Sequence, residues 1–228
     1  VDARATSVEA QDGYAQVGGR VNFRLAYLSK DGMPKGVDYN ADFTARVDGM
    51  FVEGDNVWAD VVISESDVNA GDTLTLTAVL EVTVSAIKRD EIEALTNADD
   101  CFVTKKEIYM PTFIAQKSVV VPFDDEKNVG GEIESVLGLS TTVVPLKSIA
   151  TDGGANAKLA VYAFVTYVEG GEIKQHSFEI PLEEEFNLDG VQEGDAIKLY
   201  AQTKSSKIVL QGVTDDNTIR VEGEVQLK

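Results

Sequence analysis

The chain has 228 residues, of which 43% are hydrophobic and 26% charged, and these values are typical of a folded globular protein. Asp and Glu number 39 against 20 Lys and Arg, so the net charge is −19. This charge excludes nucleic acids and anionic lipids as partners, because both bind to basic patches. No apolar run approaches the roughly 18 residues of a spanning helix, so we expect no membrane insertion.

Alternation of apolar and polar residues predicts β-strands along most of the chain. The clearest stretches are residues 21–27, 74–84 and 219–227. In the last stretch Ile219, Val221, Gly223, Val225 and Leu227 alternate with Arg220, Glu222, Glu224 and Gln226. A period of two places one set on a buried face and the other set in solvent.

Turn residues separate the predicted strands. Residues 30–32, 170–171 and 215–217 combine Gly, Asp and Asn in the manner of hairpin turns. One short acidic stretch, residues 89–95, has the pattern of a helix but also that of a loop. The sequence therefore predicts an all-β or nearly all-β protein.

The tripeptide Glu-Gly-Asp occurs twice, at residues 53–55 and 193–195. We call the difference in numbering between the two copies, 193 − 53 = 140, the repeat offset. Each copy follows an alternating strand, a turn and an extended run, and each precedes another strand. The closing strands, from Thr73 and from Thr218, have a slightly larger offset (218 − 73 = 145). Five elements in the same order predict an internal repeat.

The repeat predicts two tandem, similar antiparallel modules, each a β-sandwich or open barrel. We place the first module at residues 1–90 and the second at residues 132–228. A connecting segment, residues 91–131, contains the apolar runs 108–115 and 119–123. These runs predict one or two strands that add to a module.

The second module has IESVL at residues 133–137, LAVYAFVTYVEGG from Leu159 and EIPLEEEF from Glu179. The matching stretches of the first module are VGGRVNFRLAYLSKDG from Val17, YNADF from Tyr39 and LTLTAVLEV from Leu74. By these stretches both modules resemble the SPOCS domain (DUF3794) family of spore-associated proteins. The family pattern begins with an element that IESVL matches in the second module. The first module lacks this element, so we expect further sequence upstream.

Candidate catalytic residues are few. His176 is the only histidine and lies next to a predicted hairpin turn, so we interpret it as a surface strand residue. Cys101 is the only cysteine, which rules out an internal disulfide and favours a reducing compartment. Two aspartates precede Cys101 and disfavour a thiolate, so we interpret it as a small core residue. We assign no catalytic or cofactor-binding residue and expect no enzymatic activity.

Acidic clusters raise the alternative of calcium binding. They are residues 124–126, 183–185 and 215–217, and none has the ligand spacing of a calcium loop. Calcium therefore stays open as a partner, and we assign no metal ligand. We interpret Gly54 and Gly194 as turn residues, with the acids of both tripeptides in water.

The resemblance implies a bacterial protein of the spore envelope or the mother-cell cytoplasm. We expect a non-enzymatic structural or assembly protein that acts through protein–protein contacts of its β modules, including contacts with itself. The alternative is a secreted or surface-displayed adhesin or filament subunit. An enzyme with an unrecognised site is the third reading.

Overall fold

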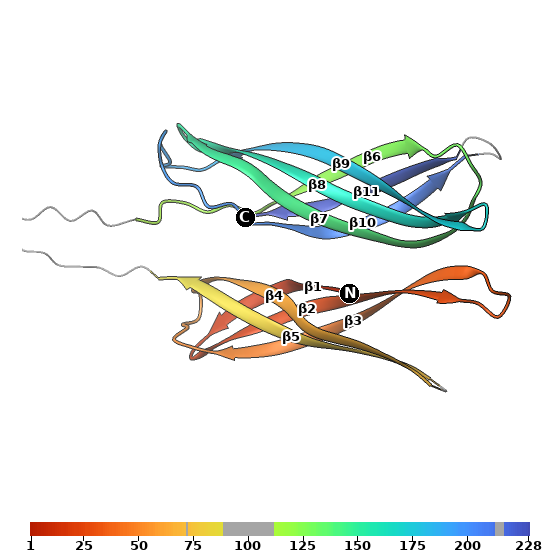
Figure 1. The fold of residues 1–228 in the computed structure, drawn as a ribbon. Coiled ribbons are helices and arrows are strands. Elements are labelled where there is room, and N and C mark those ends of the chain that lie inside the picture. The colour runs from red at the N-terminus through yellow and green to blue at the C-terminus, as the bar shows by residue number, and fades with distance from the viewer. Residues whose placement is uncertain (72, 89–111, 213–216) are drawn as a thin grey trace, which may run out of the picture. The chain divides into compact units, whose positions relative to one another are not determined.

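A computed structural model describes residues 1–71, 73–88, 112–212 and 217–228 (Figure 1). These residues form eleven β-strands in antiparallel sheets and no helix, which confirms the predicted all-β class. The strands are β1 (Asp2–Gln11), β2 (Tyr14–Leu28), β3 (Pro34–Asp48), β4 (Asn56–Ala70), β5 (Leu74–Ile87), β6 (Val119–Asn128), β7 (Ile133–Thr151), β8 (Gly154–Glu169), β9 (Glu172–Asn187), β10 (Ala201–Gln211) and β11 (Thr218–Leu227). No helix of the described residues is suited to crossing a membrane.

The chain divides into two compact units. The first comprises residues 1–24 and 38–109, and the second comprises residues 25–37 and 110–228. We call β1–β5 the first strand set and β6–β11 the second strand set. The predicted helix or loop at residues 89–95 and Cys101 both lie outside the described residues.

The second strand set is a six-stranded sandwich. One sheet has the order β7-β8-β9 and the other has the order β10-β11-β6. Their facing sides share one apolar core, in which Val161, Val165 and Phe178 of the first sheet meet Ile219 and Val225 of the second. The alternation predicted for residues 219–227 is therefore confirmed, since the apolar residues of β11 face this core.

Strand β6 comes from the segment that we predicted to connect the modules. It pairs with β11 over its full length, from Val119 opposite Leu227 to Asn128 opposite Thr218. Val121 and Phe123 of β6 are buried in the shared core. The apolar run 119–123 thus forms a strand, whereas the described residues 112–118 of the other run and its continuation have no regular structure.

The first strand set has five strands, in one sheet of order β1-β2-β3 and a second sheet that contains only β4 and β5. Its buried hydrophobic residues are few and mostly small. They are Ala10, Ala15, Val17, Val21, Phe23 and Val57. The inner face of β5 is exposed at Leu74 and half-buried from Leu76 onwards, although the sequence of β5 alternates as regularly as that of β11.

Candidate functional site

The two Glu-Gly-Asp tripeptides form corners that connect one sheet to the next. In the first corner the Asp55 carboxylate accepts a hydrogen bond from the backbone N–H of Val52 at 2.9 Å. In the second, Asp195 accepts one from Gln192 at 2.8 Å. The glycines have φ values of +88° at Gly54 and +94° at Gly194, which confirms their predicted turn role.

Each corner is also tied to the preceding hairpin turn. The Asp12 carboxylate accepts a hydrogen bond from the N–H of Glu53 at 3.2 Å. The Asp152 carboxylate accepts the matching bond from Glu193 at 3.3 Å. Sequence reasoning missed both aspartates, although the Asp-Gly pairs at 12–13 and 152–153 are themselves separated by the repeat offset.

One part of the prediction for the corners was wrong. Glu53 and Glu193 are exposed as expected, but Asp55 and Asp195 are half-buried and bonded to the backbone instead of lying in water. Asp55 also lies 3.8 Å from the Lys88 ammonium group. The corners are therefore closed structural turns, because their carboxylates are used within the fold.

Irregularities in the strand pairing recur at the same spacing. The β1–β2 register shifts between Ala5 and Ser7, and the β7–β8 register shifts between Pro145 and Lys147, one repeat offset further along the chain. Likewise β4–β5 shifts between Ile63 and Glu65, and β10–β11 shifts between Thr203 and Ser205. Both pairs of register shifts are thus separated by the repeat offset, and β-bulges are specific local features of a strand pair.

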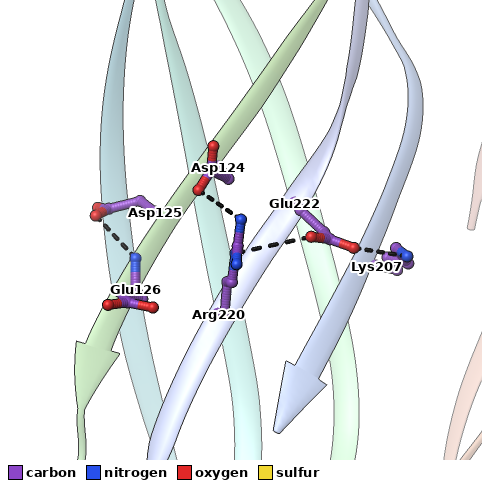
Figure 2. A network of polar contacts seen from close by, with 6 residues as sticks. All are labelled: Asp124, Asp125, Glu126, Lys207, Arg220 and Glu222. Atoms are coloured by element: carbon purple, nitrogen blue, oxygen red, sulfur yellow. Dashed lines mark hydrogen bonds and ion pairs between the residues drawn. The ribbon is translucent and has the colours of Figure 1, made fainter. Parts of the chain in front are cut away.

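The densest described charge cluster lies on the outer face of β6, β11 and β10 (Figure 2). A guanidinium nitrogen of Arg220 lies 2.9 Å from the Asp124 carboxylate, and its Nε lies 3.7 Å from Glu222. Lys207 lies 2.6 Å from Glu222 on the other side. The hydrogen bond from Lys207 lowers the pKa of Glu222, and the charges of Lys207 and Arg220 lower it further.

The surroundings of residues 124–126 bear on the alternative that these acids bind calcium. The three acids lie within β6 and not in a loop, and Asp125 accepts a hydrogen bond from the N–H of Glu126 at 2.9 Å. Asp124 is already paired with Arg220. Within the described ranges no group of His, Cys, Asp and Glu side chains is arranged to hold a metal ion.

The other acidic clusters have different surroundings. Residues 183–185 lie in β9, where Glu183 pairs with Lys158 of β8. Asp215 and Asp216 of the third cluster lie outside the described residues. His176 is half-buried in β9 and packs edge-to-face against Phe178, with 5.5 Å between the ring centroids.

A second polar group surrounds Tyr167, whose side chain is 4% exposed. Burial raises the pKa of the Tyr167 hydroxyl, and the charge of Glu169 raises it further. The Lys174 ammonium group lies 3.0 Å from Glu169, and this hydrogen bond raises the pKa of Lys174. The arrangement keeps a neutral tyrosine at the end of the core beside an ion pair between the exposed Lys174 and the half-buried Glu169.

The polar side chains that the sequence singled out, where they are described, thus lie in turns, on strand faces or in cross-strand ion pairs. Two candidates of a different kind remain, the half-buried inner face of β5 and its backbone edge, and both suit contacts with another polypeptide. Comparison of the chain with protein-family models, with curated proteins and with solved structures found no match.

Proposed function

We propose that the protein is a non-enzymatic structural or assembly component of a bacterial spore or cell-envelope layer, acting through protein–protein contacts of its β modules. The spore setting rests on the resemblance of both modules to the SPOCS domain family. The recurrence of corners and bulges at the repeat offset supports the two-module reading.

The observation that carries the proposal is the apolar surface of the hairpin β4–β5. On its outer face Val62 is 59% exposed and Val79 is 49% exposed. Glu81 is opposite Val62 and lies two positions after Val79, so these valines are diagonal neighbours across the strand pair. On its inner face Val68 and Leu74 are exposed beside the half-buried Leu76. These residues lie on opposite faces of the hairpin, and on the outer face Glu81 and Glu65 stand directly opposite Val62 and Val79. The inner-face group of Val68, Leu74 and Leu76 is the exposed apolar cluster that supports binding of another protein.

The strong negative charge of the chain affects how copies of it approach one another. With a net charge of −19, copies of the chain repel one another at a distance. β5 carries only one charged residue, Glu81, but its partner strand β4 adds the exposed acids Asp60, Glu65 and Asp67. This repulsion therefore opposes general aggregation of the chain.

The test is the location of a fluorescent fusion of the full-length protein in sporulating cells of the bacterium that encodes it. We expect the fusion to gather around the developing spore. A fusion that stays diffuse throughout sporulation would reject the proposal. Accumulation at the surface of vegetative cells, or in the medium, would instead favour the adhesin or filament subunit.

A further inference from the structure

We propose that Asp189 is a site of spontaneous covalent modification, at which the folded protein converts aspartate to isoaspartate. In this reaction the backbone nitrogen of Gly190 bonds to the side-chain carboxyl carbon of Asp189, and the main chain then runs through that side chain. The site lies in a turn at residues 188–191, between β9 and the second Glu-Gly-Asp corner. The modification is independent of the proposed function.

The sequence limits the candidates for this reaction. Aspartate followed by glycine is the pair with the least hindrance, because glycine has no side chain to block the approach of its nitrogen. Five such pairs occur, and they begin at Asp12, Asp31, Asp48, Asp152 and Asp189. All ten residues are described by the structure. Because each aspartate has the same following residue, the fold decides which of them reacts.

Four of the five glycine nitrogens are already hydrogen-bonded. Such a bond holds the nitrogen in place and away from the carboxyl group of the preceding aspartate. Within the described ranges the N–H of Gly190 has no acceptor. The four bonded N–H groups donate to backbone carbonyls, Gly13 to Phe51 at 3.0 Å, Gly32 to Ser29 at 2.9 Å, Gly49 to Gly13 at 3.1 Å and Gly153 to Val191 at 2.9 Å.

The carboxylate of Asp189 is free as well. The residue is exposed, and no described group donates a hydrogen bond to its carboxylate or forms an ion pair with it. By contrast, Asp12 and Asp152 accept hydrogen bonds at the two corners, and Asp48 lies 2.9 Å from Arg46. The pair that begins at Asp189 is therefore the one in which both reacting groups are without a described partner.

Comparison of the two strand sets shows why this pair is exposed. The backbone bonds of Gly13 span residues 49–51, and the matching bonds of Gly153 span residues 188–191. In each span the first residue donates its N–H to the hairpin glycine, and the last residue accepts the N–H of that glycine. The first residue of the shorter span is itself the glycine of an Asp-Gly pair. The longer span has one additional residue, so its Asp-Gly pair lies beyond the bonded position.

The additional residue forms a turn with the pair at its tip. The N–H of Val191 donates to the Leu188 carbonyl at 3.2 Å, so Asp189 and Gly190 are the two central residues of the turn. The φ of Gly190 is +86°, and an added Cβ there would lie 3.2 Å from Cγ2 of Ile114. Substitution of Gly190 would therefore strain the turn, and a variant at Asp189 is the cleaner test.

The reaction needs no cofactor and conserves mass. The Gly190 nitrogen loses its proton and attacks Cγ of Asp189, and one carboxyl oxygen leaves as water, which gives a five-membered succinimide ring. A water molecule then opens the ring at one of its two carbonyl carbons. Opening at the side-chain carbonyl restores aspartate. Opening at the main-chain carbonyl gives isoaspartate, whose main chain is longer by one methylene group.

The test is the accumulation of isoaspartate in the folded full chain during incubation at mildly acidic pH. Proteolysis followed by mass spectrometry with electron-transfer fragmentation locates the modified residue. We expect isoaspartate to form at residue 189 on the order of tenfold faster than at the other four aspartates, where a hydrogen bond of the glycine must break first. In guanidinium chloride, where the chain is unfolded, all five aspartates should react at similar rates.

Two variants provide a matched comparison. D189E keeps the charge but cannot form the five-membered ring, so it should lose most of the isoaspartate of the folded chain. D48E changes an Asp-Gly pair whose nitrogen is bonded, so it should leave the amount unchanged. Circular dichroism checks that both variants keep the fold.

Equal rates at the five aspartates of the folded chain, or equal losses in D189E and D48E, would overturn the proposal. A preference for residue 189 that persists in guanidinium chloride would also overturn it, because the sequence and not the fold would then be responsible.

Discussion

Asp152 accepts a hydrogen bond from the backbone N–H of Glu193 at 3.3 Å, and this bond ties the β7–β8 turn to the corner before β10. The same relationship joins Asp12 to Glu53 at 3.2 Å in the first strand set. In both sets a carboxylate from one sheet fixes the chain where it crosses towards the other. The Glu-Gly-Asp tripeptide therefore occurs where the chain leaves one sheet for the next, because its first residue is bonded to a hairpin turn.

Removing the Asp152 carboxylate should destabilise the second unit. We expect D152A to lower the free energy of unfolding by about 1 kcal/mol, the net value of one hydrogen bond at a partly exposed site. Urea unfolding followed by circular dichroism measures the change. The control is D189A, which removes an exposed carboxylate near the same corner, and it should unfold like the wild type. Equal losses in both variants would show that general charge and not the bond is responsible.

The corner glycine should resist substitution because of its backbone alone. At Gly194 φ is +94° and an added Cβ would meet no atom within 4 Å, so strain is the only penalty. We expect G194A to reduce stability by about 1 kcal/mol. Gly138 offers a matched control, since an added Cβ there also meets open space and its φ is not in the left-handed region. G138A should be neutral or slightly stabilising, and a loss there as large as at Gly194 would contradict the argument.

Much of this architecture could be predicted from the sequence because it depends on local patterns. Alternation fixes which side chains of β11 face the core, and glycine fixes the turns at residues 54 and 194. The hydrogen bond that the Glu193 N–H donates to Asp152 joins residues 41 positions apart, and no local sequence pattern predicts a contact over that separation. Among the described strands β5 has one neighbour and β11 has two, and the sequence could not predict this difference because both strands alternate alike.

The buried hydroxyl of Tyr167 should make stability depend on alkaline pH. Its pKa is raised in the folded protein, mainly by burial, so the folded state keeps its proton at a pH where the unfolded state loses it. Stability should therefore fall as the pH rises above about 10, the ordinary tyrosine pKa. Urea unfolding between pH 8 and pH 11 measures this slope. Y167F should reduce the slope, and Y162F, which changes a less buried tyrosine of the same strand, should not.

Core substitutions should affect the two strand sets unequally. Leu227 is 0% exposed, and L227A should cost about 2–5 kcal/mol through lost burial and a cavity. Leu80 is half-buried on the open inner face of β5, and L80A should cost less than half as much. Trp58 is the only tryptophan and lies in β4, so its fluorescence reports unfolding of the first unit while circular dichroism reports both. Equal losses for the two variants would mean that the inner face of β5 is covered in solution.

Hydrogen exchange of the backbone amides tests the central claim most directly, because it reports whether the hairpin β4–β5 is open to a protein partner. In the isolated chain, the amides of β5, which among the described strands pairs with β4 alone, should on average exchange faster than those of β11, which lies between β10 and β6. Protection of the β5 amides equal to that of the β11 amides would show that β5 is already covered and would contradict the account.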